Sequence, residues 1–317
     1  METTIKKQGG EKGVRKQQVL RVVLFEGVNV TKGLPRAISE LRETSAVARQ
    51  VLDAAFRMIS SQIARIEDKQ MREALFPSDL ISVIMMEQGK PQSPPSTTTT
   101  TIEEQRSLPT HIGTAITVAF QVALFAATHE NQQKKKKKEI VSGDEREHEK
   151  INETSEIKLI GHSSGIASAL AVSTAWKSTT DESETKTTTT TTFNLETLIK
   201  AMEKIVFALF WAGFQVQVAV KETGHSIYEK WAASVKTTKE EISDRIKEFN
   251  SRDQQRHEDD MIEISGMNSK NRVNIVGASE SLEKFHKILP ETIKMTLISL
   301  TQPVHYSRFR NLFQIVC

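Results

Sequence analysis

The sequence predicts an α/β fold, in which a core with a mainly parallel sheet carries a smaller ferredoxin-like subdomain. The first observation is a short apolar run at 157–160, followed at once by Gly-x-Ser-x-Gly at 161–165 and a small-residue helical stretch at 166–172. This order of strand, sharp turn and helix is the context that a nucleophile elbow requires. The second observation is a change of pattern near residue 236, after which the elements follow the order α-β-β-α-β.

The first half of the chain alternates apolar elements with polar segments. Residues 1–18 are polar and are expected to form a disordered tail, whereas 19–25 are a buried-strand candidate. Apolar residues at helical spacing predict helical structure over 34–66, and the nearly all-round apolar stretch at 110–128 predicts a buried helix. The expected polar inserts are 90–107, 129–154 and 177–192.

The second half begins with the clearest helix pattern in the chain. Asn194 is expected to cap this helix, and its apolar residues keep a 3-4 spacing as far as Gly213. We expect a strand around 216–220 to begin the ferredoxin-like part. The capping box at 238–241 then opens the next helix. The remaining expected elements are strands at 261–264, 272–276 and 294–300, and a helix at 279–289.

The motif at 161–165 is the strongest sign of chemistry in the sequence. Its tight turn is expected to strain the backbone at Ser163 and to expose the hydroxyl, while Gly161 and Gly165 let strand and helix approach closely. The backbone amide of Ser164 would face a developing oxyanion, with added positive potential from the helix N-terminus. The motif is short, so a chance match is the alternative, but the flanks on both sides fit.

Composition narrows the function classes. The net charge of +3 gives no strong argument for nucleic acid binding, and no apolar stretch has the length of a membrane span. The first 18 residues lack the apolar segment of a signal peptide, and the single cysteine, Cys317, excludes an intrachain disulfide. We therefore expect a cytoplasmic protein that binds neither nucleic acid nor membrane and holds no metal.

Four segments in series resemble the acyltransferase domains of fatty acid and polyketide synthases. They are Gly-His-Ser-Ser-Gly at 161–165, Leu-Phe-Trp-Ala-Gly at 209–213, the stretch 267–277 that ends Val-Asn-Ile-Val-Gly, and Pro-Val-His at 303–305. The chain looks closest to the acetyltransferase region of the fungal-type fatty acid synthase β subunit and to the starter-unit acyltransferase domains of fungal polyketide synthases. This resemblance covers about 20–310 and implies a core like that of the α/β-hydrolases.

The resemblance implies ping-pong acyl transfer between thioesters. Ser163 would be the nucleophile and His305 the base, with the backbone amides of Ser164 and Val28 forming the oxyanion hole. The family usually has Phe-x-Gly-Gln-Gly where this chain has Phe-Glu-Gly-Val-Asn at 25–29, so Val28 keeps the amide but loses the side-chain amide. Because the chain has eight histidines, an ordinary loop histidine is the alternative for His305.

The resemblance also implies substrate contacts and partners. Asn268 resembles a position near the acyl site, with a turn former as the alternative, and Phe210, Trp211 and Ala212 would line the acyl pocket unless they belong to the core. No bound cofactor is expected. Acyl-CoA is the implied donor, the phosphopantetheine arm of an acyl carrier protein is the acceptor, and other synthase domains are further candidate partners.

The acyl group is expected to be neutral. Malonyl-type relatives use an arginine on the helix after the elbow to bind the free carboxylate, and a guanidinium fork suits that task. Here no arginine occurs between Ser163 and Arg245. Acetyl, or a somewhat longer neutral acyl group, therefore fits better than malonyl.

Two alternatives stay open. A serine hydrolase or thioesterase of the α/β-hydrolase type would need an acid between Ser163 and the histidine, and the candidate acids lie in a helix or a charged loop. These acids are Asp244, Asp253, Asp259 and Asp260. The other alternative is a non-catalytic fragment of a synthase, because the family continues past the histidine whereas this sequence stops twelve residues after His305.

The predicted organisation has four parts. The tail is 1–18, the acyltransferase core with its inserts is 19–215, and the ferredoxin-like subdomain is 216–300. Residues 301–317 are expected to return to the core with the catalytic histidine and to be truncated relative to the family.

Overall fold

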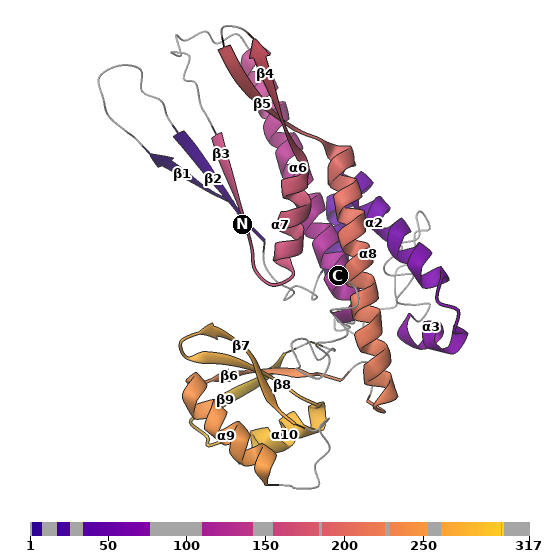
Figure 1. Cartoon of the computed structure of the whole chain (residues 1–317), viewed down its shortest axis with the longest axis vertical. Helices are drawn as coiled ribbons and strands as arrows, with labels where there is room; N and C mark the ends of the chain where they lie inside the picture. Colours follow the sequence, from indigo (N-terminus) through magenta and orange to yellow (C-terminus); the bar gives the residue numbers. More distant parts are fainter. Residues whose placement is uncertain are drawn as a thin grey trace, which may run out of the picture. The chain divides into compact units, whose positions relative to one another are not determined.

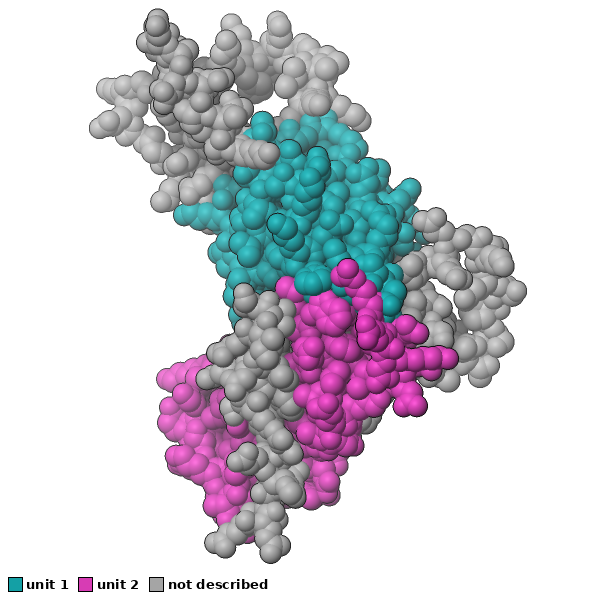
Figure 2. Space-filling view, turned by 45° about the vertical axis from the view of Figure 1, so that its right-hand side comes forward, with its two compact units in different colours: residues 1–64, 82–89, 114–207 teal, residues 65–81, 90–113, 208–317 magenta. Residues whose placement is uncertain are grey.

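The computed structural model of the 317-residue chain divides into two compact units (Figure 2). Unit 1 comprises Met1–Ala64, Ser82–Gly89 and Thr114–Phe207, and unit 2 comprises Arg65–Ile81, Lys90–Gly113 and Ala208–Cys317. The structure describes residues 2–7, 18–25, 34–76, 110–141, 155–183, 186–225, 229–252, 261–298 and 300. The expected insert at 90–107 and the expected return to the core at 301–317 lie outside these residues, and the predicted domain boundaries stay predictions.

Unit 1 contains a three-stranded sheet (Figure 1). Strand β2 (Gln18–Phe25) lies in the middle, with β1 (Glu2–Lys7) antiparallel on one side and β3 (Ser155–Gly161) parallel on the other. The parallel register runs from Val19 opposite Ser155 to Phe25 opposite Gly161. The buried-strand candidate and the strand before the elbow are thus confirmed as a parallel pair. The expected disordered tail is wrong for β1, because its backbone groups pair with β2.

Helix α7 (Gly165–Thr174) follows β3 and packs on β3 and β2. The helical structure expected over 34–66 is present as two helices, α1 (Leu34–Thr44) and α2 (Ala46–Ala64). The chain leaves the helical path only at Ser45, whose hydroxyl accepts a hydrogen bond from the amide of Ala48 at 3.1 Å. A serine at a helix start satisfies a backbone donor in this way, and this explains why the break falls there.

Helix α6 (Thr110–Val141) confirms the predicted buried helix and extends it into the expected polar insert at 129–154. The expectation that no apolar stretch has the length of a membrane span is wrong by length and composition alone. Within the described residues, Ile112–Lys135 is long and apolar enough to cross a membrane, and 67% of its apolar window is buried inside the protein. A buried core helix meets the same criterion, so this is weak evidence for a membrane span.

The insert at 177–192 contains a β-hairpin. Strands β4 (Trp176–Ser183) and β5 (Lys186–Phe193) pair antiparallel along their full length. Threonine is β-branched and favours strands, so the threonine tract of this polar insert is compatible with a strand. At the base of the hairpin, the rings of Trp176 and Phe193 contact His129 of α6, with centroid distances of 5.3 and 4.5 Å.

Helix α8 (Leu195–Glu222) is the long helix that the sequence predicts. Its cap is confirmed, because the side-chain oxygen of Asn194 accepts a hydrogen bond from the amide of Thr197 at 2.8 Å. The strand expected at 216–220 is wrong, since these residues continue α8 and bury Val216 and Val220 on it. The β-branched valines favour a strand locally, but a helix already under way adds a hydrogen bond per residue and overrides that preference.

A ferredoxin-like lobe follows α8 in unit 2 (Figure 1). Its four strands pair antiparallel in the order β7-β8-β6-β9, and two helices connect them in the pattern β-α-β-β-α-β. The first strand is β6 rather than the stretch at 216–220. The elements are β6 (Ala232–Lys236), α9 (Lys239–Ser251), β7 (Glu263–Ser269), β8 (Arg272–Val276), α10 (Ser279–Ile288) and β9 (Lys294–Ile298).

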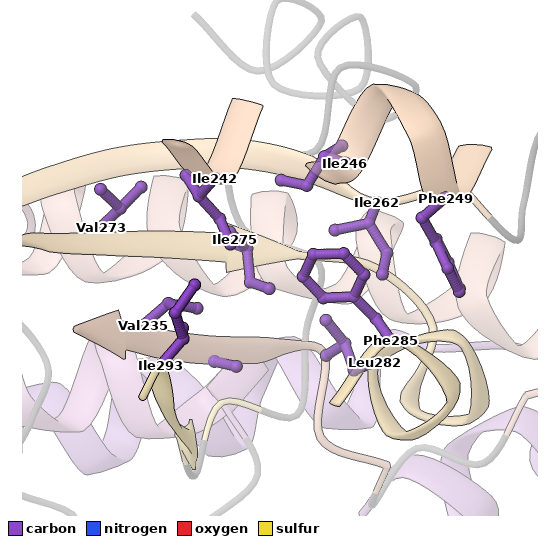
Figure 3. Packing of buried hydrophobic residues seen from close by; sticks show 11 residues of the cluster. Val235, Ile242, Ile246, Phe249, Ile262, Val273, Ile275, Leu282, Phe285 and Ile293 are labelled. Carbon is purple, nitrogen blue, oxygen red and sulfur yellow. The ribbon is translucent and has the colours of Figure 1, made fainter. Parts of the chain in front are cut away.

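The lobe has its own hydrophobic core, shown in Figure 3. Ile242, Ile246 and Phe249 of α9 face Val273 and Ile275 of the sheet. From α10, Leu282 and Phe285 complete the cluster, and the ring of Phe285 lies edge-on to that of Phe249 at a centroid distance of 5.1 Å. The antiparallel subdomain predicted from the sequence pattern is therefore confirmed as a sheet with two covering helices.

Candidate active site

The turn between β3 and α7 places Ser163 in a strained backbone conformation. β3 ends at Gly161 and α7 begins at Gly165, so only three residues connect strand to helix. Ser163 has φ of 54°, and no other described residue apart from glycine has a positive φ. The left-handed region costs a residue with a Cβ roughly 1 kcal/mol or more, and such outliers gather at functional sites. The side chain of Ser163 is exposed, as a nucleophile elbow requires.

Gly161 has no room for a side chain. A Cβ placed there would lie 2.4 Å from the carbonyl oxygen of Gly165 and 2.5 Å from the amide nitrogen and Cα of Ile166. All three atoms belong to the backbone of α7, so none can move without moving the helix. The predicted role of this glycine, close approach of strand and helix, is confirmed, and the contact also shows that α7 covers the Gly161 side of the sheet.

Backbone hydrogen bonds hold the turn in shape. The amide of His162 donates to the carbonyl of Phe25 on β2 at 3.0 Å, which extends the parallel ladder by one bond. The first bonds of α7 run from the amide of Gly165 to the carbonyl of His162 and from the amide of Ile166 to the carbonyl of Ser163, at 2.9 and 3.0 Å. The backbone at Ser163 is therefore anchored on both sides.

The amide of Ser164 is free for a ligand within the part of the chain that the structure describes, because no backbone acceptor bonds it there. Ser164 is the N-cap residue of a ten-residue helix, where the helix dipole favours negative charge. This is the position that the sequence predicts for an oxyanion donor. The expected second donor, Val28, lies outside the described residues.

A side-chain hydrogen bond ties α7 to α6. Ser168 is fully buried, and its hydroxyl donates to the side-chain oxygen of Gln121 at 2.6 Å. Sequence reasoning missed this pair, although a serine and a glutamine stand out within otherwise small or apolar helix stretches. The bond fixes α7 and hence the turn that α7 holds.

The remaining predicted site residues that the structure describes lie in unit 2, whereas Ser163 lies in unit 1. His305 lies outside the described residues, so the expected reach between Ser163 and His305 stays a prediction. Asn268 is exposed on β7 and exchanges two hydrogen bonds, each 3.1 Å long, with the side-chain amide of Asn274 on β8. This cross-strand pairing fits the alternative that Asn268 shapes the hairpin.

The predicted acyl-pocket residues lie on the second half of α8. Phe210 is buried and its ring stacks on that of Phe76 at a centroid distance of 5.6 Å. Trp211 is partly buried and meets Phe210 edge-on at 5.5 Å, and Ala212 is also partly buried. Phe210 therefore packs within unit 2, whereas Trp211 and Ala212 keep part of their surface accessible.

The described structure argues against one candidate acid for a hydrolase triad. Asp244 lies on α9, leaves 83% of its side chain exposed and faces Lys247 at 3.6 Å. A triad acid orients a histidine from a buried, hydrogen-bonded position, which Asp244 does not offer. The other candidate acids lie outside the described residues.

Sequence reasoning also missed Gln217 on α8. The residue is fully buried, yet neither polar atom of its side chain has a hydrogen-bond partner among the described residues. A signal was available, because Gln217 is a polar residue on the apolar stripe that the 3-4 spacing of this helix defines.

Comparison with known proteins supports the family resemblance. Residues 186–305 match the model of the family described as starter unit:ACP transacylase in aflatoxin biosynthesis. This range holds three of the four resembling segments and lacks only the elbow at 161–165. A search of curated proteins finds no match.

Solved structures with a similar fold are acyltransferases. FabD from Acinetobacter baumannii is 14% identical, with a TM-score of 0.51, and the similarity covers 93% of this chain and 66% of that one. A malonyl CoA-acyl carrier protein transacylase from Clostridium perfringens is 16% identical, with a TM-score of 0.50, and 94% and 66% of the two chains are covered.

A loading acyltransferase of the avermectin modular polyketide synthase is 16% identical, with a TM-score of 0.47, and 91% and 64% of the two chains are covered. The chain thus spans about two thirds of the length of these three structures. The resemblance is confirmed: residues 186–305 match the starter-unit transacylase family, and the chain has an α/β fold like that of the FabD acyltransferases.

Proposed function

We propose that this protein transfers a neutral acyl group from CoA to the phosphopantetheine thiol of an acyl carrier protein, with Ser163 as the acyl-bearing residue. The observation that carries the proposal is the turn at Ser163, with its φ of 54° between a parallel strand and a helix N-terminus. A serine in that position has an exposed hydroxyl beside the unpaired amide of Ser164. Acyl transfer needs both groups, the hydroxyl as nucleophile and the amide as a hydrogen-bond donor to the oxyanion. The family match at 186–305 supports the same reaction class.

The first half-reaction forms the acyl-enzyme. The hydroxyl oxygen of Ser163 attacks the thioester carbonyl, and His305 takes the hydroxyl proton. The oxyanion of the tetrahedral intermediate accepts hydrogen bonds from the amides of Ser164 and Val28. When the intermediate collapses, the carbon–sulfur bond breaks, and the CoA thiolate leaves with the proton that His305 returns.

The second half-reaction repeats these steps with a different nucleophile. The phosphopantetheine thiol attacks the acyl-serine ester while His305 takes the thiol proton, and Ser163 leaves as an alcohol after receiving that proton. No acid and no metal takes part. A cytoplasmic location is part of the same proposal, since CoA and carrier proteins are found there.

The proposed acyl group is neutral because α8 carries no arginine. A malonyl carboxylate that enters an apolar pocket without a cationic partner loses several kcal/mol of solvation free energy. Trp211 and Ala212, which are partly buried, offer apolar surface for a methyl or a short alkyl group.

Incubation of the chain with acetyl-CoA and, separately, with malonyl-CoA tests the substrate class. Intact-mass spectrometry should show an acetyl adduct that the Ser163→Ala variant lacks, and little or no malonyl adduct. Ala212→Arg should raise malonyl loading relative to acetyl loading, because a guanidinium group can form two hydrogen bonds with the malonyl carboxylate. Equal or preferred malonyl loading in the unmodified chain would overturn the substrate claim, and loading of neither group would favour a non-catalytic fragment.

A further inference from the structure

Gln217 has a buried side chain whose polar atoms have no partner. The residue is 0% exposed, and within the described residues neither its side-chain nitrogen nor its side-chain oxygen makes a hydrogen bond. Among the described residues, Gln217 is the only one with two buried side-chain polar atoms that both lack a hydrogen-bond partner. Buried polar groups are nearly always hydrogen-bonded, so an exception of this kind calls for an explanation.

Two other glutamines show that the state of Gln217 is specific to its position. Gln62 on α2 is also buried, at 4% exposed, but its amide nitrogen donates to the hydroxyl of Ser61 at 2.9 Å and approaches the sulfur of Met58 at 3.5 Å. Gln215 lies two residues before Gln217 on α8 and is exposed to solvent. Of these three glutamines, only Gln217 loses its hydrogen bonds to water on folding without forming others in the protein. This loss lowers the stability of the folded chain.

The position of Gln217 connects it with the predicted acyl-pocket stretch. It lies seven residues, or two helical turns, after Phe210, so both side chains are on the same face of α8. Gly213 lies between them on this face and contributes no side chain. The unpaired amide is therefore on the α8 face that carries Phe210, within unit 2.

The chemistry of the amide defines what it can bind. A glutamine side chain donates through its NH2 group and accepts through its oxygen, and here both functions are unused. A ligand group that both accepts and donates, such as a secondary amide, would satisfy them together. The phosphopantetheine arm contains two secondary amides, and this arm is common to CoA and to a loaded carrier protein.

We propose that Gln217 binds an amide of the phosphopantetheine arm. The proposal rests on the proposed function for the identity of the ligand, but it concerns binding and not the chemistry at Ser163. Because donor and acceptor share the arm, Gln217 could bind either of them. An unpaired amide that costs stability in the free protein gains its partner when a thioester substrate is bound.

Binding of CoA tests the proposal without the need for catalysis. Isothermal titration calorimetry should show that Gln217→Met weakens CoA binding about tenfold, as the loss of one or two hydrogen bonds predicts. Binding of adenosine 3′,5′-bisphosphate, which lacks the arm, should be unchanged. Gln215→Met, a matched substitution at an exposed position of the same helix, should leave both affinities within about twofold of the original values.

Thermal unfolding without ligand adds a second measurement. Gln217→Met should raise the Tm because it replaces an unpaired polar group by an apolar one of similar size, whereas Gln62→Met should lower it because a bonded amide is lost. A Gln217→Met chain that fails to fold or melts earlier would show that the amide has a partner, and it would overturn the proposal.

The remaining outcomes separate this proposal from the proposed function. CoA affinity that is equal in Gln217→Met and the unmodified chain, an equal loss for CoA and the bisphosphate, or no CoA binding at all would overturn the role of Gln217. The Ser163→Ala chain should bind CoA normally and load no acyl group. If the unmodified chain binds CoA through Gln217 but also loads no acyl group, the proposed function fails while the role of Gln217 stands.

Discussion

The ferredoxin-like lobe and the elbow region use apolar residues in different ways. In the lobe, apolar side chains of the sheet, of α9 and of α10 meet in one buried cluster (Figure 3). In the elbow region, Phe25 and Gly161 lie on the sheet face toward α7, whereas Leu24 and Ile160, neighbours on the opposite face, are 37% and 48% exposed. Ile166 and Leu170 of α7 are more than half exposed as well.

This difference separates a stable part from a strained part. The lobe pairs its four strands in one sheet and buries apolar residues of both helices in one core. The elbow region keeps a residue with positive φ and an unpaired amide at the end of a parallel strand pair, and one face of this pair leaves Leu24 and Ile160 partly exposed. We infer that the elbow is the less stable region and that its geometry is retained for chemistry.

The largest expected effect is on the lobe core. Phe285→Ala removes a fully buried ring that contacts Phe249, and it should lower the free energy of unfolding by about 3–5 kcal/mol. Leu170→Ala, at an exposed position of α7, should change it by less than about 0.5 kcal/mol. Urea unfolding followed by circular dichroism measures both, and comparable losses would contradict the contrast between the two regions.

A smaller effect is expected from the glycine under the elbow. Gly161→Ala forces a Cβ against the backbone of α7, so we expect a loss of about 1–3 kcal/mol, together with loss of acyl loading at Ser163. Gly266→Ala in β7 is the matched control, because a Cβ there meets no atom within 4 Å. That control should be neutral or stabilise by up to about 1 kcal/mol. Full acyl loading by Gly161→Ala would show that the close contact is not needed for the turn.

The smallest expected effect is a pH dependence in the lobe. The hydroxyl of Thr237 donates a hydrogen bond to Glu241 and lowers the pKa of that carboxyl below its usual value. Because the folded pKa is the lower one, this contribution to stability is present above the unfolded pKa and is lost as the pH falls through the folded pKa. Thr237→Val should therefore reduce the loss of stability on acidification from neutral pH to below pH ~4. A pH series of urea midpoints that is identical in both chains would contradict it.

The residues that follow local rules were predictable, and those that depend on distant contacts were not. The hydroxyl of Thr238 accepts a hydrogen bond from the amide of Glu241, as the capping box predicts. The carboxyl of Glu241, however, bonds Thr237 instead of completing the box. Likewise, Val216 and Val220 have strand propensity, but the continuing helix and the burial of both residues override it.

The candidate site divides in the same way. Ser163 and Gly161 could be predicted because the motif itself dictates the turn, and the positive φ and the close contact agree with it. The bond from Ser168 to Gln121 joins residues 47 positions apart, and the unpaired state of Gln217 depends on what surrounds α8. The sequence marks these residues as polar positions within apolar helices, but it does not show which of them find a partner, since that depends on packing between elements.

The most direct test of the account is the location of the acyl group after reaction with acetyl-CoA. The chain is quenched, digested and mapped by tandem mass spectrometry, with Ser163→Ala and His305→Ala treated in parallel. We expect the acetyl group on Ser163 of the unmodified chain, none at this position in the Ser163→Ala chain, and strongly reduced loading in the His305→Ala chain. An acetyl group on another residue, or equal labelling of the Ser163→Ala chain, would contradict the claim that the strained turn makes Ser163 the nucleophile.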